Sequence, residues 1–202
     1  MHKTFEQHFL LESKNDCIKF ALIPVYFRPP HKGHYATLKH YNDLVGDNGK
    51  VIVFMDSTNG SNENDFPVQN AKEILEIYCK NLPNVIIAFA PKDPFASIYG
   101  FGKTAYKVCG EKQPIVLFGC TKKSDEITKC RKAKQFYEKH YSDIYVIDPA
   151  TTATNIGYAG ETAISEIDFQ NATNDKEKVK AFLPEHLSDE DIEKVVELLD
   201  IN

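Results

Sequence analysis

The stretch IKFALIPVYFRPPHKGHYATLKHYNDLV, residues 18–45, decides the fold. Its first part, residues 18–26, is an apolar run typical of a buried β-strand. Its last part, residues 34–45, places Leu38 and Tyr41 at the spacing of one helix face. The turn RPPHKGH, residues 28–34, joins the two. A strand, a short turn and a helix in this order predict the first half of a β-α-β unit.

The same alternation continues along the chain. Four further short apolar runs, rich in Val and Ile, are separated by helical patterns. The runs are residues 50–56, 84–90, 114–119 and 143–148, and the helical patterns between them are residues 67–82, 94–110 and 124–141. Such alternation predicts a parallel sheet covered on both faces. We therefore expect an α/β fold: a Rossmann-like three-layer α/β/α domain with a five-stranded parallel sheet and a central first strand.

The C-terminal part of the chain is expected to be a helical appendage. Residues 173–184 and 188–200 both have helical patterns, and Ser188 is expected to be the N-cap of the second helix. We expect a core over residues 1–149 and a helical segment over residues 150–202 that packs on it within the same domain.

Composition excludes several classes of protein. The chain has 202 residues, enough for one domain with a sizeable core, and its net charge of −5 argues against broad nucleic-acid binding. No apolar run has the length of a membrane span, and the N-terminus lacks the pattern of a signal peptide. The five cysteines form no C-x-x-C pair, which favours a reducing compartment over a disulfide frame or a zinc site. We expect a cytoplasmic protein with no nucleic-acid partner, no membrane partner and no metal held by the protein.

The turn of residues 28–34 contains the residues most suited to chemistry. A helix N-terminus presents free backbone N–H groups and roughly half a positive charge, and phosphate binds there readily. Gly33 lets a ligand approach the backbone closely, and the imidazoles of His31 and His34 can donate hydrogen bonds to phosphate oxygens. These features predict a site that holds phosphate and stabilises the charge that develops on it.

With Phe27, Pro29, His31, Gly33 and His34 following the first strand, the turn resembles the first signature of the nucleotidyltransferase superfamily, G-x-F-D-P-x-H-x-G-H. The resemblance implies that both histidines are catalytic and stabilise a pentacoordinate transition state. It implies transfer of an NMP group from ATP or CTP, bound with Mg²⁺, to a phosphorylated small molecule, with release of pyrophosphate. It points equally to adenylyltransferases and cytidylyltransferases. Members of this family commonly assemble, so a homo-oligomer is compatible with it.

The first signature departs from the family pattern at two positions. Val25 stands where the family has glycine, and Arg28 replaces its aspartate or glutamine. Because an arginine forms strong charge-assisted hydrogen bonds to phosphate, Arg28 is a candidate nucleotide-binding residue together with Phe27.

A second signature of the family, close to I-S-x-T-x-x-R, has its best counterpart in AGETAIS, residues 159–165. The resemblance implies that Thr162 and Ser165 bind the terminal phosphates of the nucleotide. Ser165 stands where the family has arginine, and Glu161 has the wrong charge for a phosphate site. A missing charged contact favours an alternative: a nucleotide-binding protein of the same fold with impaired catalysis.

Other residues could supply the missing positive charge. Lys122 and Lys123 follow the fourth apolar run, at the edge of the sheet where ligands bind, and Gly119 ends that run. We assign all three to the nucleotide-binding group. A third hypothesis is a P-loop phosphotransferase, since GFGKT, residues 100–104, resembles the end of a P-loop and contains Lys103.

Overall fold

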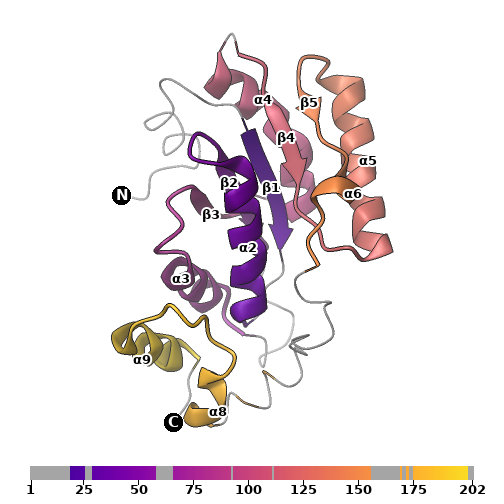
Figure 1. Ribbon diagram of the computed structural model, residues 1–202. Coiled ribbons are helices and arrows are strands. Elements are labelled where there is room, and N and C mark those ends of the chain that lie inside the picture. Colours follow the sequence, from indigo (N-terminus) through magenta and orange to yellow (C-terminus); the bar gives the residue numbers. More distant parts are fainter. Residues whose placement is uncertain are drawn as a thin grey trace.

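The protein was analysed as a computed structural model, which describes residues 19–25, 29–57, 66–91, 93–110, 112–155, 169, 172 and 175–199. Five parallel strands form one sheet in the order β3-β2-β1-β4-β5 (Figure 1). The strands are β1 (Lys19–Val25), β2 (Lys50–Met55), β3 (Val85–Phe89), β4 (Ile115–Phe118) and β5 (Tyr145–Val146). The predicted α/β class, the parallel sheet and the central position of the first strand are confirmed.

Helices cover both faces of the sheet, because successive side chains of a strand point to opposite sides. Ala21 and Ile23 of β1 lie in one apolar core with α2, α3 and the C-terminal helix α9 (Asp189–Leu198), whereas Phe20 and Leu22 lie in a second core with α4 and α5. The three-layer arrangement expected from the sequence follows from these two cores. The helices around the sheet are α2 (Lys32–Val45), α3 (Val68–Tyr78), α4 (Pro94–Cys109), α5 (Ser124–His140) and α6 (Pro149–Thr152).

The fifth strand is shorter than the sequence pattern suggested. Residues 143–148 were expected to be extended, but β5 contains only Tyr145 and Val146. The chain then enters α6, where Asp148 is the N-cap and accepts a hydrogen bond from the N–H of Ala150 at 2.8 Å. An N-cap aspartate followed by Pro149 at the first helical position is a recognised start signal for a helix, and this helix start ends the extended segment early.

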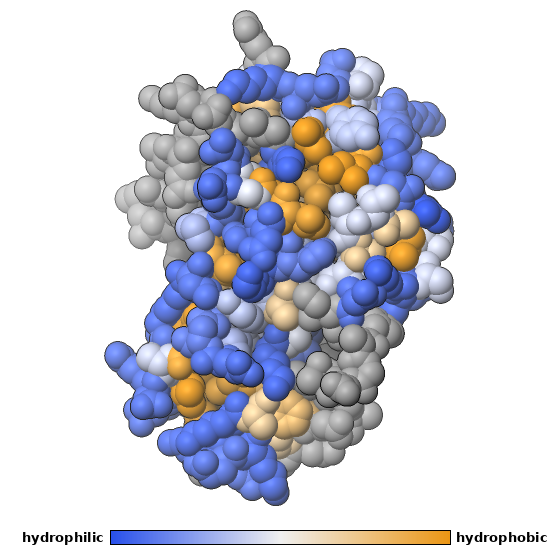
Figure 2. Space-filling model, in the orientation of Figure 1, coloured by the Kyte–Doolittle hydropathy of each residue, from blue (hydrophilic) through white to orange (hydrophobic). Residues whose placement is uncertain are grey.

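The surface carries apolar side chains where helices leave the sheet less covered. Figure 2 shows them between α2 and α5, over the strands of the central sheet. On the outer strand β5, the side chain of Tyr145 is 59% exposed. Within the described residues, no helix combines the length and the apolar character needed to cross a bilayer.

The C-terminal helices pack against the core. They are α8 (Lys176–Lys180) and α9 (Asp189–Leu198), and Ser188 caps α9 as expected, with its hydroxyl accepting from the N–H of Asp191 at 3.2 Å. The side-chain amide of Asn70 on α3 donates to the carbonyl of Leu198 at 2.8 Å, and Lys80 forms an ion pair with Asp191. The helix expected over residues 173–184 is limited to α8, which ends before Pro184.

Candidate functional site

The candidate site lies between the end of the central strand and the start of the first helix of the described chain. Strand β1 ends at Val25 and α2 begins at Lys32, so the start of α2 is at the carboxyl edge of the sheet. Ligands of open α/β sheets bind at this edge. Two residues assigned to the nucleotide from the sequence, Phe27 and Arg28, lie outside the described residues.

Both histidines of the first signature cap this helix. His31 is the N-cap residue, and its Nδ1 accepts a hydrogen bond from the N–H of Gly33 at 3.1 Å. Nδ1 of His34 accepts from the N–H of His31, also at 3.1 Å. Together they form a capping box built from two imidazoles. Since each neutral ring accepts at Nδ1, its single proton is on Nε2, and both side chains are Nε2–H donors.

The backbone N–H groups of the first turn are not free, which corrects the sequence-based expectation. The N–H of Lys32 donates to the carbonyl of Phe182 at 2.8 Å, and the N–H of Gly33 is used by His31. The N–H of His34 donates to the carbonyl of His31 at 2.9 Å. A phosphate at this helix end would therefore have to be held by imidazole N–H groups rather than by backbone amides.

The two imidazoles form a stacked pair in an apolar setting. Their ring centroids are 3.7 Å apart with an interplanar angle of 23°. The buried ring of Phe169 meets His31 edge to face at 5.9 Å. Burial lowers the pKa of His31 from 6.5 to about 4. Burial, with a smaller effect from charge on His31, lowers the pKa of His34 well below its ordinary value. Both rings are thus neutral near pH 7.

These shifts predict that the protein loses stability in mild acid. The folded-state pKa of His31 lies below the unfolded value, so the unfolded chain takes up the proton first as the pH falls. The contribution is fully present above pH 6.5 and is lost as the pH falls to about 4. The free energy of unfolding is expected to fall by up to about 3 kcal/mol from His31 over this window. The lowered pKa of His34 also makes the free energy of unfolding fall as the pH falls. Urea unfolding at a series of pH values measures the effect.

A substitution that keeps the cap but cannot titrate provides the control. In His31→Asn the side-chain oxygen can accept from the first-turn N–H, since asparagine is among the best N-cap residues. In this variant the free energy of unfolding is expected to fall less between pH 6.5 and 5 than it does in the wild type. The same substitution at His140, which is exposed on α5, is expected to leave it unchanged. A wild-type stability that stays constant between pH 6.5 and 5 would contradict the assignment of buried, neutral imidazoles.

The two glycines assigned to the site both have packing reasons for their identity. A methyl group at Gly33 would lie 3.0 Å from Cε1 of His31, so the capping imidazole itself occupies the space beside this residue. At Gly119 a methyl group would lie 2.6 Å from Cγ1 of Ile23 on β1. Gly119 also donates its N–H to the carbonyl of Leu22 at 2.8 Å, extending the pairing of β4 with β1. These contacts explain the glycines without a ligand.

The candidate lysines lie at the same edge of the sheet but beside a different part of α2. Both Lys122 and Lys123 are exposed. Cys120, just before them, is hydrogen-bonded to the hydroxyl of Tyr41. Tyr41 is seven residues along α2 from His34, or roughly 10 Å of helix. The structure therefore places the chain before the lysines beside the middle of α2, not beside its first turn.

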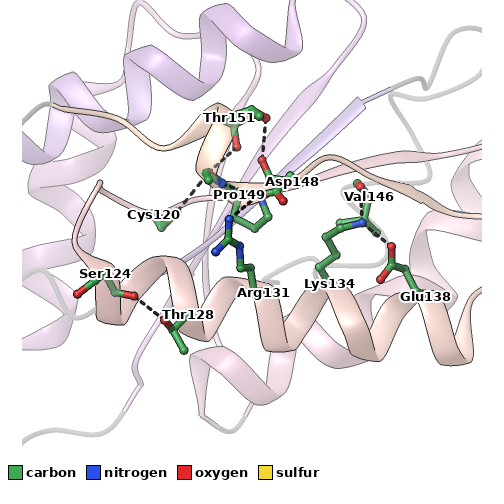
Figure 3. A network of polar contacts seen from close by, with 12 residues as sticks. Cys120, Ser124, Thr128, Arg131, Lys134, Glu138, Val146, Asp148, Pro149 and Thr151 are labelled. Atoms are coloured by element: carbon green, nitrogen blue, oxygen red, sulfur yellow. Dashed lines mark hydrogen bonds and ion pairs between the residues drawn. The ribbon is translucent and has the colours of Figure 1, made fainter.

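Two other cations of α5 are used within the fold (Figure 3). A guanidinium nitrogen of Arg131 lies 3.5 Å from a carboxylate oxygen of Asp148, the N-cap of α6. The ammonium group of Lys134 donates to the carbonyl of Val146 at 3.1 Å and pairs with Glu138. These contacts hold α5 against β5 and α6.

The counterpart of the second signature is bracketed by described residues. Thr162 and Ser165 themselves lie outside the described part of the chain. Before them, Thr154 pairs with Thr121 in an isolated parallel bridge, and its carbonyl accepts from the N–H of Lys122 at 3.0 Å. After them comes Phe169, against His31. The chain thus enters this region near Lys122 and leaves it at the first signature.

The P-loop hypothesis is wrong, because residues 100–104 lie inside α4 rather than at a strand–helix junction. The helix begins at Pro94 with Asp93 as its N-cap. Lys103 is exposed on the helix surface. Gly102 packs beneath the ring of Tyr141, where a methyl group would lie 2.4 Å from Cε2. The glycine is needed for this helix contact.

The two glycines of this stretch make a matched pair. Gly102→Ala is expected to lower the free energy of unfolding by about 1–3 kcal/mol, since the Tyr141 ring must move. That ring is held by a 3.2 Å hydrogen bond from its hydroxyl to the carbonyl of Tyr99. At Gly100 nothing lies within 4 Å of the added methyl group. Gly100→Ala is expected to raise stability by up to about 1 kcal/mol through helix propensity. Urea unfolding of both variants measures the contrast, and equal effects would contradict the packing account.

The described residues contain no cluster of three or more His, Cys, Asp or Glu side chains that could hold a metal ion. We therefore expect any Mg²⁺ to bind together with the nucleotide.

No protein-family model matches the chain, and no curated protein matches it significantly.

Proposed function

We propose that the protein is a nucleotidyltransferase that moves an NMP group from ATP or CTP to a phosphorylated small molecule and releases pyrophosphate. The observation that supports this most is the pair of neutral imidazoles at the start of α2. Each is fixed through Nδ1 by a backbone N–H, so each presents an Nε2–H donor of defined orientation. Preorganised donors of this kind stabilise charge that develops on phosphate oxygens.

In the proposed reaction the nucleotide enters as its Mg²⁺ complex, and the metal offsets part of the phosphate charge. A phosphate oxygen of the acceptor attacks the α-phosphorus, forming one P–O bond while the bond to the β-phosphate breaks. His31 and His34 donate hydrogen bonds to the oxygens of the α-phosphoryl group as negative charge builds on them. Pyrophosphate leaves with the electrons of the broken bond. No side chain becomes covalently attached, and Arg28, Lys122 and Lys123 are the proposed supporting cations.

The cytosol is the proposed place of this reaction. Four cysteines of the described chain, Cys79, Cys109, Cys120 and Cys130, are free and buried. Buried free thiols are typical of a reducing compartment.

The test is pyrophosphate release by the full chain with Mg²⁺, with ATP and CTP supplied separately against a panel of phosphorylated acceptors. Release with one nucleotide and one acceptor supports the proposal and identifies both substrates. A thermal shift with a nucleotide but no release with any acceptor supports the alternative, a binding protein in which Ser165 does not replace the family's arginine. If the protein shows no pyrophosphate release and no thermal shift with either nucleotide, a nucleotide site of either kind is contradicted.

A further inference from the structure

The first turn of α2 is contacted at successive positions by the C-terminal part of the chain. The ring of Phe169 meets His31, the carbonyl of Phe182 accepts from the N–H of Lys32, and the His186 ring lies 4.5 Å from the Tyr35 ring. Figure 1 shows α8 and α9 at the end of the molecule toward which β1 points. The C-terminal segment therefore meets the start of the helix at His31, Lys32 and Tyr35.

Phe169 is the member of this group that touches a proposed catalytic side chain. It is fully buried, and among the described residues its ring also contacts Phe182, at 5.5 Å between ring centroids. His31 is consequently enclosed by the stacked ring of His34 on one side and by the edge-to-face ring of Phe169 on another. An imidazole packed in this way is held in its N-cap position, and these two rings shield part of it from water.

We infer that Phe169 is a positioning residue for the proposed reaction: its ring holds the His31 imidazole in its capping orientation and shields one side of it from water. The inference rests on the proposed function for its catalytic meaning, because His31 is the group that would donate to phosphate. Protonation of His31 at Nδ1 would remove the acceptor for the N–H of Gly33. Phe169 therefore maintains both the orientation of the donor and its neutral form.

The groups around His31 support this account. On α2 the titratable side chain in contact with it is His34. On α3 the hydroxyl of Tyr78 donates to the carbonyl of Pro30, next to His31, and burial raises the pKa of Tyr78, which stays neutral. On α8 the exposed charges pair among themselves: Lys178 with Asp175, and Lys180 with Glu177. Burial lowers the pKa of His31, and the ring of Phe169 is part of what buries it.

The test compares the same substitution at two buried phenylalanines on opposite faces of the sheet. Phe169→Leu opens the wall beside His31. Phe118→Leu removes a ring that is equally buried but packs against Tyr137 in the other core. Both are expected to lower the melting temperature. Only Phe169→Leu is expected to raise the pKa of His31, by about 1 or more as water reaches the ring.

The pKa is read from the imidazole resonances of the full chain by NMR between pH 3 and 8, a range that includes the lowered pKa of about 4, with His31→Asn identifying the signal. In the enzyme assay, the acid limb of kcat/KM is expected to move to higher pH in Phe169→Leu and to stay in place in Phe118→Leu. An unchanged His31 titration in folded Phe169→Leu overturns the inference. If Phe169→Leu does not fold, Phe169→Met, which fills the volume without a ring, is measured against the same criterion.

The outcomes separate this inference from the proposed function. In one outcome, the pKa of His31 rises in Phe169→Leu but the wild type releases no pyrophosphate. This outcome supports the role of Phe169 in holding His31 and overturns the proposed reaction. Wild-type pyrophosphate release with an unmoved titration supports the reaction and overturns the role of Phe169.

Discussion

Replacing His34 by alanine is expected to lower kcat/KM for pyrophosphate release by about 100- to 1,000-fold. The substitution removes an Nε2–H donor from the start of α2, where the phosphoryl group is proposed to react. It also removes the Nδ1 acceptor for the N–H of His31. Part of any loss of activity could therefore come from a loosened helix end, and a second variant is needed to separate the two effects.

His34→Glu is that variant. Glutamate at the third helical position is a standard partner of a capping box, and its carboxylate can accept from the N-cap N–H. It is expected to keep the melting temperature within a few degrees of the wild type and still to lose most of the activity, since an ionised carboxylate has no N–H to donate. His140→Ala, on the exposed end of α5, is the control for general effects of removing a histidine. Full activity of folded His34→Glu would place the reacting phosphate elsewhere.

The layout of the sheet could be predicted from the sequence because it depends on local patterns. Runs of Val and Ile separated by amphipathic helices specify a parallel sheet, and the resulting strand order puts β1 in the centre. The position of His31 at the start of a helix followed from the same reasoning. Its use as an N-cap did not, because histidine is not among the residues that usually cap helices.

The remaining features of the site depend on residues far apart in the chain. Neither the contact of Phe169 with His31 nor the hydrogen bond from Lys32 to the carbonyl of Phe182 has a periodic or motif signal. The expectation of free first-turn N–H groups was wrong for this reason: their acceptors include a carbonyl about 150 residues away in the sequence. Sequence patterns indicate which groups a helix end offers, whereas tertiary packing decides which of them remain available.

Tyr41→Phe is expected to cause a large loss of stability, about 2–4 kcal/mol in the free energy of unfolding. The buried hydroxyl of Tyr41 donates to the carbonyl of Cys120 and accepts from its N–H, both at 2.9 Å. Removing this one oxygen leaves two buried backbone groups without their partner, and each costs about 1–3 kcal/mol. Burial also raises the pKa of Tyr41, so the hydroxyl stays neutral and can make both bonds. Urea unfolding measures the loss.

Tyr137→Phe is the matched control, because the buried hydroxyl of Tyr137 donates to the carbonyl of Ile98 at 2.7 Å and its backbone partners lie inside helix α4. The free energy of unfolding is expected to fall clearly less in this variant than in Tyr41→Phe. The difference has a functional side, since Cys120 leads directly to Thr121 and Lys122. If Lys122 contacts nucleotide phosphate, loosening this connection in Tyr41→Phe raises KM for the nucleotide, whereas Tyr137→Phe leaves KM unchanged. Equal losses of stability in the two variants would show that Cys120 finds other partners, and that Tyr41 does not fix the chain before Lys122.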